Sequence, residues 1–518
     1  MVTSPHHLAS QAGLAVLKDG GTAIEAAVAT AAALAVVYPH MNSIGGDSFW
    51  LVARPDGPVE AIDGCGAAAE ACIPALYAGH AAIPWRGPLA ANTVAGTVSG
   101  WAAALATSAG WAPPLPLGRL LRDAIDHAEH GAVVTAGGAA VAAAKHDELR
   151  DISGYAAAFT EAGRPLVEGA VLRQPALART LRRLAADGLH GFYDGDLARD
   201  IAADLAAAGS PVAARDLARH RATRPAPLHA RIGDAMVFNL PPPTQGVASL
   251  LILALFDRLG IDHADGFAHV HGLVEATKQA FLWRDRHVGD PASMSVEAQA
   301  LLDHAAGLDA MAGRIDPRAA LPWPRGADAG DTVWFGAVDA AGGVASVIQS
   351  TYFEFGSGVV LPETGIVWQN RGASFRLSGG GPNLLRPLAK PFHTLNPALA
   401  RFDDGRTMAY GTMGGEGQPQ TQAAIFTRYA RFGQGLQAAV TAPRWLLGRT
   451  WGEDSVTLKI EDRFDPLLYE ELRSAGHDVE LVPPFSAQMG HAGALVRHAG
   501  GVIEGASDPR SDGSVAAW

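Results

Sequence analysis

The segment that decides the fold is "AGDTVWFGAVDAAGGVASVIQS", residues 329–350. A short linker of Gly, Ala and Asp is followed at once by Thr332 and by two runs of alternating apolar residues. Such runs are typical of β-strands, and the Gly342-Gly343 pair between them is typical of a hairpin turn. The segment therefore predicts a strand hairpin that begins at Thr332, directly after a loop, as though a second protein started there.

Ala-rich helical segments dominate the sequence upstream of this hairpin. "HHLASQAGLAVLKDGG" predicts a helix that ends at its glycine pair, and Thr22 with Glu25 predicts the capping box of the next helix. Residues 235–260 predict a strand, a Pro-rich loop and an apolar helix. Residues 310–331 show no periodic pattern and are rich in Gly, Pro, Ala and Asp, so they predict a loop.

The sequence downstream of the hairpin is richer in strands. "PALARFDDGRTMAYGTM", residues 397–413, predicts a second hairpin with an Asp-Gly turn. The strands "VTLKIE" and "DVELVP" follow, with a helix between them near residues 465–475. Helices, then strands, then mixed elements predict an α+β protein of stacked helix and sheet layers. The length of 518 residues fits several domains or one large layered fold.

Composition excludes several classes of function. The net charge of -12, without a basic cluster, argues against nucleic acid as a partner. The most apolar segment, residues 23–38, contains Glu25, and the start of the chain lacks a secretory pattern, so we expect a cytoplasmic protein without a membrane span. The two cysteines, Cys65 and Cys72, give neither a disulfide framework nor a thiolate metal site. We expect no metal and no cofactor.

Common catalytic motifs are missing from the sequence. It contains no G-x-S-x-G elbow, no phosphate loop that ends in Gly-Lys-Ser/Thr, and no H-E-x-x-H. His269 and His271 are two positions apart on a predicted helix and face different sides. We interpret them, and the pair His6-His7, as residues of solvated surfaces. This leaves Thr332 as the candidate nucleophile.

The chemistry of Thr332 depends on the bond before it. A threonine hydroxyl is a weak nucleophile until a base takes its proton, and a free α-amine of pKa ~8 is such a base. This amine would exist only if the Asp331-Thr332 bond were cut. The hydroxyl can begin that cut by attacking the preceding carbonyl, in an N-to-O acyl shift that hydrolysis completes. Taken alone, Thr332 would be an ordinary strand residue.

The whole chain, however, resembles the γ-glutamyltranspeptidase family of N-terminal-nucleophile hydrolases. The matching segments run in order along the chain and include "VVYPHMNSIGGDSFWLV", "FNLPPPTQGVASL", "EATKQAFLWRDRHVGDP", "GDTVWFGAVDAAG", "YGTMGGEGQPQTQAA" and "GVIEGASDPRSDGS". The resemblance implies a proenzyme that cuts itself into a large fragment, 1–331, and a small fragment, 332–518. The fragments would stay together as a heterodimer, which could itself dimerise, in one four-layered αββα fold.

The resemblance also implies roles for single residues. Thr332 falls on the nucleophile, with its new amine as the base, and Ser350 falls where a hydroxyl hydrogen-bonds the nucleophile. Gly414 and Gly415 fall on the pair whose backbone N–H groups form the oxyanion hole, where the loss of one donor typically costs ~3 kcal/mol of barrier. By themselves, two glycines after a strand would predict only a turn.

The positions that hold the substrate's α-carboxylate in this family are altered. The family's arginine, in an R-E-x-A-P segment, is missing, and "DGCGAAAEA" places Cys65 nearest to its position. The family's paired serines correspond to His393 and Thr394 in "KPFHTLNP". We predict that His393 and Thr394 contribute to the substrate site.

The positions that hold the α-amino group are altered as well. "WQNRGASF" places Arg371 and Ser374 where the family has a Gln or Glu and an Asp, and Tyr352 stands at a position usually filled by Asn. An acidic group suited to an amine is lost and a guanidinium is gained, and arginine binds carboxylates with two parallel hydrogen bonds. We therefore predict a substrate with a carboxylate and no α-amino group. The alternative for Arg371 is an ordinary surface arginine in a loop.

Within the family, this pattern most resembles the oxamate amidohydrolases, which release ammonia from oxamate in purine-ring (allantoin) breakdown. A related acylase that acts on another carboxylate-bearing amide would be equally consistent with the pattern. Two other functions stay open. One is a γ-glutamyltransferase or glutathione hydrolase that binds γ-glutamyl amides with substitute residues. The other is an unprocessed homologue that only binds a small anion.

Overall fold

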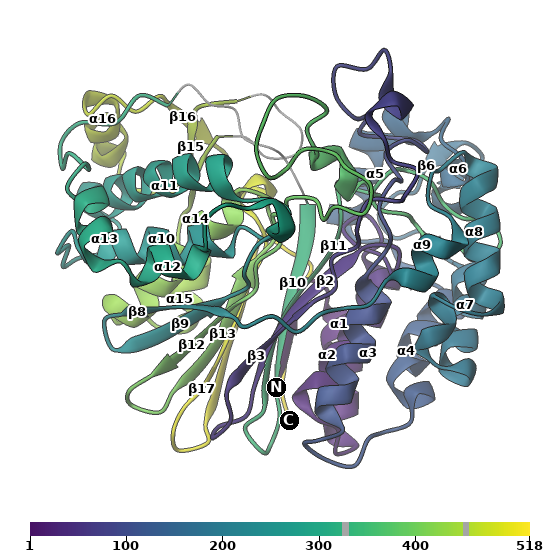
Figure 1. Ribbon diagram of the computed structural model, residues 1–518. Helices are drawn as coiled ribbons and strands as arrows, with labels where there is room; N and C mark the ends of the chain where they lie inside the picture. Colours follow the sequence, from purple (N-terminus) through teal and green to yellow (C-terminus); the bar gives the residue numbers. More distant parts are fainter. Residues whose placement is uncertain (324–330, 449–454) are drawn as a thin grey trace.

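Two antiparallel sheets form the centre of the protein (Figure 1). The computed structural model describes residues 1–323, 331–448 and 455–518, and among them each of these sheets has six strands. The first sheet has the order β19-β1-β10-β11-β2-β3 and consists of β1 (Val2–Ser4), β2 (Asp47–Ala53), β3 (Val59–Asp63), β10 (Asp331–Val338), β11 (Val344–Tyr352) and β19 (Ser514–Ala516). The second has the order β18-β17-β13-β12-β9-β8 and consists of β8 (Leu228–Ile232), β9 (Ala235–Asn239), β12 (Ala398–Phe402), β13 (Thr407–Thr412), β17 (Ala492–Arg497) and β18 (Ile503–Ser507).

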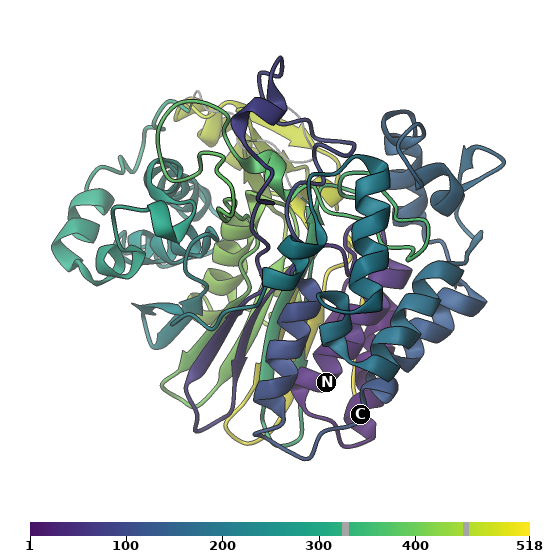
Figure 2. The same cartoon turned by 45° about the vertical axis from the view of Figure 1, so that its right-hand side comes forward.

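Helices cover the outer side of each sheet (Figures 1 and 2). One hydrophobic cluster joins the first sheet to α1 (His7–Lys18), α2 (Ala23–Val37), α3 (Thr97–Ser108), α4 (Leu117–His130), α7 (Pro175–Asp187) and α8 (Asp196–Ala208). A second joins the other sheet to α10 (Gly246–Asp257), α11 (Phe267–His287), α13 (Ala305–Ala312), α14 (Gly417–Phe426), α15 (Leu436–Thr441) and α16 (Pro466–Ser474). A third cluster contains residues of both sheets, among them Phe49, Trp334 and Leu399. The predicted α+β combination of helices and sheets is confirmed, and the two central sheets are antiparallel.

Smaller elements complete the chain. A third sheet contains β14 (Trp445–Leu447), β15 (Leu458–Glu461) and β16 (Val479–Val482). The remaining pieces are α5 (Ala136–Leu149), α6 (Tyr155–Phe159), α9 (Ala214–Arg219), α12 (Ala298–Asp303) and the short pairs of β4 (Ala132–Val133) with β7 (Val171–Leu172) and of β5 (Thr160–Glu161) with β6 (Arg164–Pro165). Of the helices in the described ranges, none combines the length and apolar character that a membrane crossing needs.

Local sequence signals explain where the first helices begin and end. The predicted capping box is confirmed, because the Thr22 hydroxyl accepts from the Glu25 N–H at 3.2 Å and the Glu25 carboxylate accepts from the Thr22 N–H at 2.8 Å. Helix α1 ends at Lys18, just before Gly20 turns the chain with a φ of 87°. The hairpin of β10 and β11 is also confirmed, and Gly342 supplies its turn with a φ of 83°.

The alternation along β10 divides its side chains between two buried faces. Val333 and Phe335 belong to the cluster with the helices, whereas Trp334 and Val338 belong to the cluster between the sheets. The second sheet approaches closely at Gly411, where a Cβ atom would lie only 2.2 Å from the Trp334 ring. Thr332 shares the parity of Trp334 and therefore faces the second sheet.

The structure corrects the prediction that the histidines of α11 lie on a solvated face. His269 and His271 are both buried, since α11 contacts α10, α14 and α16. His269 Nε2 lies 2.9 Å from the Thr427 hydroxyl, and His271 Nδ1 lies 2.8 Å from Nε2 of His477. A spacing of two places the pair on different helix sides, as predicted, but both sides are covered.

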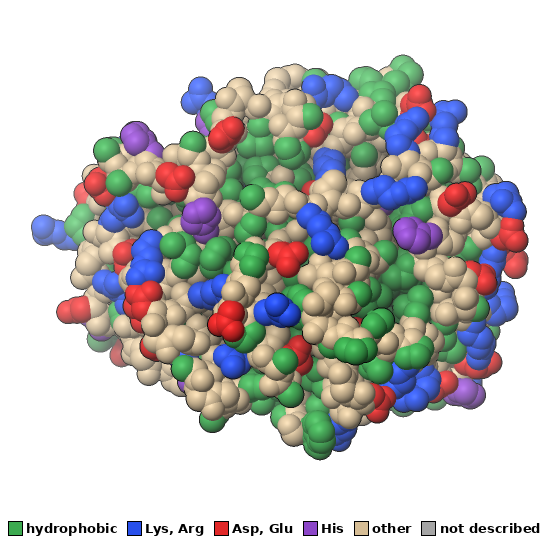
Figure 3. Space-filling view, turned by 60° about the horizontal axis from the view of Figure 1, so that its bottom comes forward, with side chains coloured by type: hydrophobic (Ala, Val, Ile, Leu, Met, Phe, Trp, Pro, Cys, Tyr) green, Lys and Arg blue, Asp and Glu red, His purple; other side chains and the backbone are tan. Residues whose placement is uncertain are grey.

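Two further predictions about surfaces and loops are changed. His6 is buried and caps α1 by accepting from the Leu8 N–H at 3.2 Å, while His7 is exposed as predicted. The loop predicted for residues 310–331 starts after α13, and its part at 324–330 lies outside the described residues. On the face shown in Figure 3, acidic and basic side chains lie interspersed.

Candidate active site

Thr332 lies at a β-bulge at the start of β10. Asp331 pairs with Tyr352 and Val333 pairs with Gln349, so two residues of β11 stand opposite Thr332 alone. Bulges of this kind bend a strand and redirect a side chain, and they are frequent beside active sites. Thr332 is fully buried. The predicted cleavage bond, Asp331-Thr332, thus lies where a regular ladder is interrupted.

Ser350 lies on β11, the strand next to that of Thr332, and Asp47 lies on β2, one strand further in the sheet. Ser350 on β11 pairs directly with Asp47 on β2, so their side chains lie on the same face of the sheet. The Ser350 hydroxyl accepts a hydrogen bond from the Tyr352 N–H at 2.8 Å. Only glycine fits at Gly46, because a Cβ atom there would lie 2.1 Å from the Ser350 carbonyl oxygen. Ser350 is therefore beside the nucleophile strand, while its predicted bond to the nucleophile stays a prediction.

The beginning of α14 approaches Thr332 from the second sheet. Gln418 in its first turn donates from Nε2 to the Thr332 hydroxyl oxygen at 3.4 Å. The loop before the helix carries Gly414 and Gly415 with φ values of 116° and 53°, in the left-handed region that favours glycine. A helix N-terminus carries partial positive charge, which favours a developing oxyanion. This arrangement suits the predicted role of the glycine pair.

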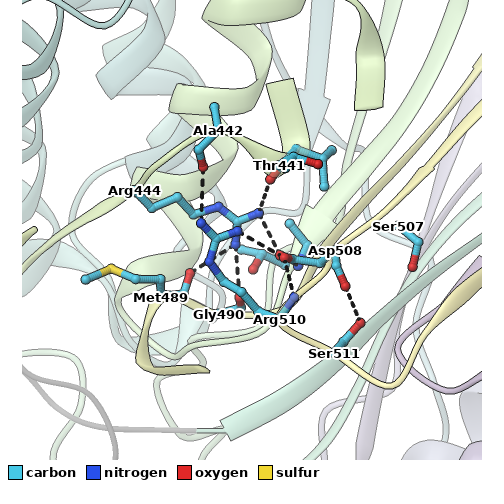
Figure 4. Close-up of polar contacts among 12 residues, drawn as sticks. Thr441, Ala442, Arg444, Met489, Gly490, Ser507, Asp508, Arg510 and Ser511 are labelled. Atoms are coloured by element: carbon cyan, nitrogen blue, oxygen red, sulfur yellow. Dashed lines mark hydrogen bonds and ion pairs between the residues drawn. The ribbon is translucent and has the colours of Figure 1, made fainter. Parts of the chain in front are cut away.

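Arg444, Asp508 and Arg510 form a buried ion cluster (Figure 4). Arg444 donates to the carbonyl oxygen of Gly490 at 2.9 Å and forms an ion pair with Asp508 at 2.6 Å. Arg510 pairs with the other oxygen of Asp508 at 3.0 Å. Gly490 in turn packs on the loop, since its Cα would lie 3.5 Å from a Cβ atom at Gly414. The cluster fixes the backbone on which Gly414 rests.

Gln245 connects the glycine loop to the segment that contains Thr394. Gln245 donates from Nε2 to the carbonyl oxygens of Thr394 at 2.7 Å and Gly415 at 2.8 Å. Its own oxygen accepts from Arg284 at 2.8 Å, and Arg284 pairs with Glu416 at 3.0 Å. All five residues are buried. Gln245 therefore ties the backbone of the glycine loop to the backbone at Thr394.

Arg371 is buried, so the alternative of a surface arginine is wrong. It begins the short 3₁₀ helix η4 (Arg371–Ser374) and donates to the Thr394 hydroxyl at 3.1 Å. Its guanidinium lies 3.6 Å from the centre of the Tyr352 ring. Tyr352 reaches this position with a φ of 85°, which a side chain of its size adopts only when its surroundings enforce it. The segments that carry Arg371, Tyr352, His393 and Thr394 are called the wall below. The contacts of Arg371 with Tyr352 and Thr394 show that this wall surrounds a buried positive charge.

His393 and Asp47 form a hydrogen-bonded pair next to this arginine. His393 Nε2 lies 2.9 Å from a carboxylate oxygen of Asp47, and both side chains are buried. Burial raises the pKa of Asp47 to about 7, although Gly66, Gln369 and Arg371 oppose the shift. Burial, together with Arg371 and Lys390, holds the pKa of His393 well below its ordinary value. The pair therefore resists carrying two separate charges.

Cys65, which the sequence places nearest to the family's missing arginine, and the predicted residue Ser374 lie near His393. Cys65 is buried beside the pair, and burial, with Asp47 and Asp63, raises the pKa of its thiol well above the usual range. The Ser374 hydroxyl donates to the Phe392 carbonyl oxygen at 3.1 Å. Ser374 therefore holds the backbone next to His393, and its contact with substrate stays a prediction.

Sequence reasoning missed Asp47, Gln245 and Gln418. Each lies in a segment that carries the family resemblance. In each segment the neighbouring glycines or prolines indicate a turn or loop, and no local pattern singles out the polar residue. Asp47 had one available signal, since it is a carboxylate at the start of an otherwise apolar strand. The partners of the two glutamines come from segments remote in the chain, which sequence patterns do not pair.

Two buried groups in the described ranges have the donor types of a metal site. The donor atoms of Asp47, Cys65 and His393 lie within 4.8 Å of one another, as do those of His271, Glu275 and His477. In the second group Lys278 already neutralises Glu275 at 2.6 Å. In the first, Asp47 and His393 already bind each other. We assign no metal to either group.

The fold agrees with the comparisons to known proteins. The sequence profile of the Gamma-glutamyltranspeptidase family matches residues 9–518, and the chain belongs to this family. It is 54% identical over 519 residues to the oxamate amidohydrolase proenzyme of Klebsiella pneumoniae, across 100% of this chain and 98% of that protein. It is 40% identical to the glutathione hydrolase-like YwrD proenzyme of Bacillus subtilis, across 99% and 97%.

A solved structure supports the same class. The cephalosporin acylase from Bacillus halodurans matches with a TM-score of 0.92 at 33% identity, across 100% of this chain and 95% of that one. Together with the family membership, this likeness makes the chain an amide hydrolase of the γ-glutamyltranspeptidase family.

Proposed function

We propose that the chain is a proenzyme that cuts itself between Asp331 and Thr332 and becomes a threonine-dependent amidohydrolase. Its substrate would be a small amide that bears a carboxylate, such as oxamate, and the products oxalate and ammonia. The fragments would be 1–331 and 332–518. Each central sheet contains strands from both fragments, which supports the proposal that the fragments would stay together in one four-layered αββα fold.

The reaction would use the new N-terminus as base and acid. The α-amine of Thr332 takes the hydroxyl proton while the oxygen attacks the amide carbonyl, and the N–H groups of Gly414 and Gly415 bind the oxyanion. Collapse breaks the C–N bond, and the amine returns the proton to the leaving ammonia. Water then attacks the ester by the same route, which releases the carboxylic product and restores Thr332.

The observation that carries the substrate proposal is the buried guanidinium of Arg371. A carboxylate fits the fork of a guanidinium, because the two groups form two parallel hydrogen bonds. Thr394 and Tyr352 orient this side chain, and Gln245 ties Thr394 to the glycine loop. The 54% identity to an oxamate amidohydrolase proenzyme supports the same substrate.

The test combines a denaturing gel with two activity assays. We expect two bands, with Thr332 at the N-terminus of the smaller one, and ammonia release from oxamate by the processed protein. An uncut chain after long incubation would overturn self-processing. Turnover of a chromogenic γ-glutamyl amide without turnover of oxamate would overturn the substrate proposal in favour of a γ-glutamyltransferase or glutathione hydrolase.

A further inference from the structure

Gln418 is the side chain of α14 that contacts the candidate nucleophile. Its Nε2 lies 3.4 Å from the hydroxyl oxygen of Thr332, and both residues are buried. Gln418 stands in the first turn of α14, shortly after the glycine loop. It therefore touches the atom that attacks the amide carbonyl in the proposed reaction.

A backbone group fixes which end of the Gln418 amide faces Thr332. The Asn396 N–H lies 3.2 Å from Oε1 of Gln418. A backbone N–H is only a donor, so the amide atom that it meets must be the acceptor oxygen. The NH₂ end of the amide then faces Thr332, and an amide turned the other way would set two donors against each other. Gln418 thus acts as a donor to the Thr332 oxygen.

Asn396 is itself held by buried neighbours. Gln422, one turn further along α14, donates to the Asn396 carbonyl oxygen. The Asn396 side chain donates to the Ser249 hydroxyl on α10. The three residues are buried. The donor that faces Thr332 is therefore positioned by contacts within the protein, before any substrate binds.

A donor at this oxygen matters because the charge of the oxygen changes during the reaction. A hydroxyl oxygen has two lone pairs, so one can accept from Gln418 while the other attacks the carbonyl carbon. The oxygen becomes negative as its proton leaves, and hydrogen bonds to charged oxygens are roughly twice as strong as those to neutral ones. An interaction that is stronger in the transition state than in the ground state accelerates the reaction.

We propose that Gln418 is a further catalytic residue, which stabilises negative charge on the Thr332 oxygen. The oxygen carries this charge when it bonds to the carbonyl carbon, of Asp331 in the self-cut and of the substrate amide in hydrolysis. It carries the charge again when water displaces it from the ester. Gln418 keeps its own protons throughout.

The inference rests on the proposed function, because it assumes that Thr332 is the nucleophile. It adds a donor to the attacking and leaving oxygen. Gly414 and Gly415 would act on a different atom, the carbonyl oxygen of the substrate. A merely structural role for Gln418, as a brace between α14 and Asn396, is the alternative that the experiment must separate.

The experiment measures self-cutting and steady-state kinetics of Gln418→Met. Methionine keeps the approximate length of the side chain and removes the donor. We expect kcat for oxamate to fall by at least about tenfold, because one donor to a developing charge is lost. KM should change by less than about threefold, since Gln418 faces the nucleophile rather than the carboxylate site. A denaturing gel at fixed times should show slower cutting.

Gln422→Met is the matched control. Gln422 is the same residue type on the same helix, and its hydrogen bonds go to Asn396. Both variants remove a partner of Asn396, so they should lower the melting temperature by similar amounts. The control should be cut and should keep kcat within about threefold of the wild type. Equal losses of kcat in both variants would reduce Gln418 to a brace and overturn the inference.

The remaining outcomes separate the inference from the proposed function. If the wild-type chain stays uncut and does not hydrolyse oxamate, the proposed function fails and the inference fails with it. If the wild type is cut and active and Gln418→Met keeps its kcat, only the inference is overturned. A folded Gln418→Met chain that stays uncut, beside a cut Gln422→Met chain, supports the inference through its first step.

A crystal structure of the processed wild-type enzyme gives a second test, which does not depend on the folding of any variant. Nε2 of Gln418 should lie within hydrogen-bond distance of the Thr332 hydroxyl oxygen after the cut. A Gln418 side chain turned away from Thr332 would overturn the inference and leave the proposed function standing.

Discussion

The strand end that carries Thr332 and the wall that carries Arg371 and His393 are built in different ways. Thr332 and Ser350 lie on neighbouring strands of one hairpin, so their approach follows from β-sheet pairing. The wall joins loops that are remote in the chain, and His393 and Asp47 are 346 residues apart. In the proposed enzyme, the reaction class would therefore rest on regular structure, whereas substrate choice would rest on loops, which vary more easily.

A second buried cluster shows that burial and histidines alone do not make a site. His271 has partners at both ring nitrogens, at 2.8 Å from His477 and 2.8 Å from the Asp316 carbonyl oxygen. Lys278 neutralises Glu275 and also donates to the Leu321 carbonyl oxygen at 2.6 Å. This cluster holds the backbone at Asp316 and Leu321. His393 differs from it, because its buried Nδ1 makes no hydrogen bond to the residues that the structure describes.

The largest effect is expected at the strand end. Thr332→Ala removes both the attacking group of the cut and the nucleophile, so the chain should stay intact and lose at least about 10⁴-fold in kcat for oxamate. A denaturing gel, mass spectrometry and an ammonia assay measure this. Thr332→Ser keeps a hydroxyl and should still be cut and active. Two bands from the alanine variant would remove Thr332 from its role.

The next effect tests whether the wall acts independently of the strand end. Arg371→Met should lower kcat/KM for oxamate by about 100-fold or more, because the loss of one partner from a buried charge pair costs about 3–5 kcal/mol. The variant should still cut itself, since Arg371 acts on the substrate carboxylate. Arg371→Lys should lose less. An unchanged kcat/KM in the methionine variant would contradict the proposed carboxylate site.

A smaller effect is expected at Gln245, the joint that connects the glycine loop to the wall through its hydrogen bonds to Gly415 and Thr394. Gln245→Ala leaves the carbonyl oxygens of Thr394 and Gly415 without this donor, which should cost about 2 kcal/mol in the free energy of unfolding. Because the glycine loop is also released, kcat should fall by about tenfold. Gln174→Ala is the matched control, since Gln174 donates to the Val36 carbonyl oxygen at 2.8 Å, away from the site. Equal losses of kcat in both variants would argue against a specific joint.

The smallest effect on activity is expected in the second cluster, where a change should alter stability with pH. Burial, followed by Lys278 and His271, lowers the pKa of His477 to about 3. The unfolded chain takes up this proton near about pH 6.5 and the folded chain does not, so this contribution to stability is present above that pH and is lost as the pH falls. Between about pH 6 and about pH 4, the free energy of unfolding should fall less steeply with falling pH in His477→Gln than in the wild type. The two slopes should differ by about 1.4 kcal/mol per pH unit. Chemical denaturation measures it, and equal slopes would contradict the assignment.

Sequence patterns predicted the elements that depend on neighbours in the chain. The capping box of Thr22 and Glu25 and the hairpin after Thr332 were found because capping, alternation and turn glycines act over a few residues. The same local rules failed for His269 and His271. Helical spacing says which side a residue faces, but whether that side is covered depends on the helices that pack there.

The sequence by itself determined the candidate nucleophile, the strand that carries it and the family to which its segments point. Only the tertiary structure decided that Arg371 is buried, that Asp47 pairs with His393 and that Gln245 connects two walls. The physical reason is the range of the interactions. Local hydrogen bonding and side-chain periodicity are written in adjacent residues, whereas burial, and the pKa shifts that burial causes, exist only after sheets and loops from distant segments have packed together.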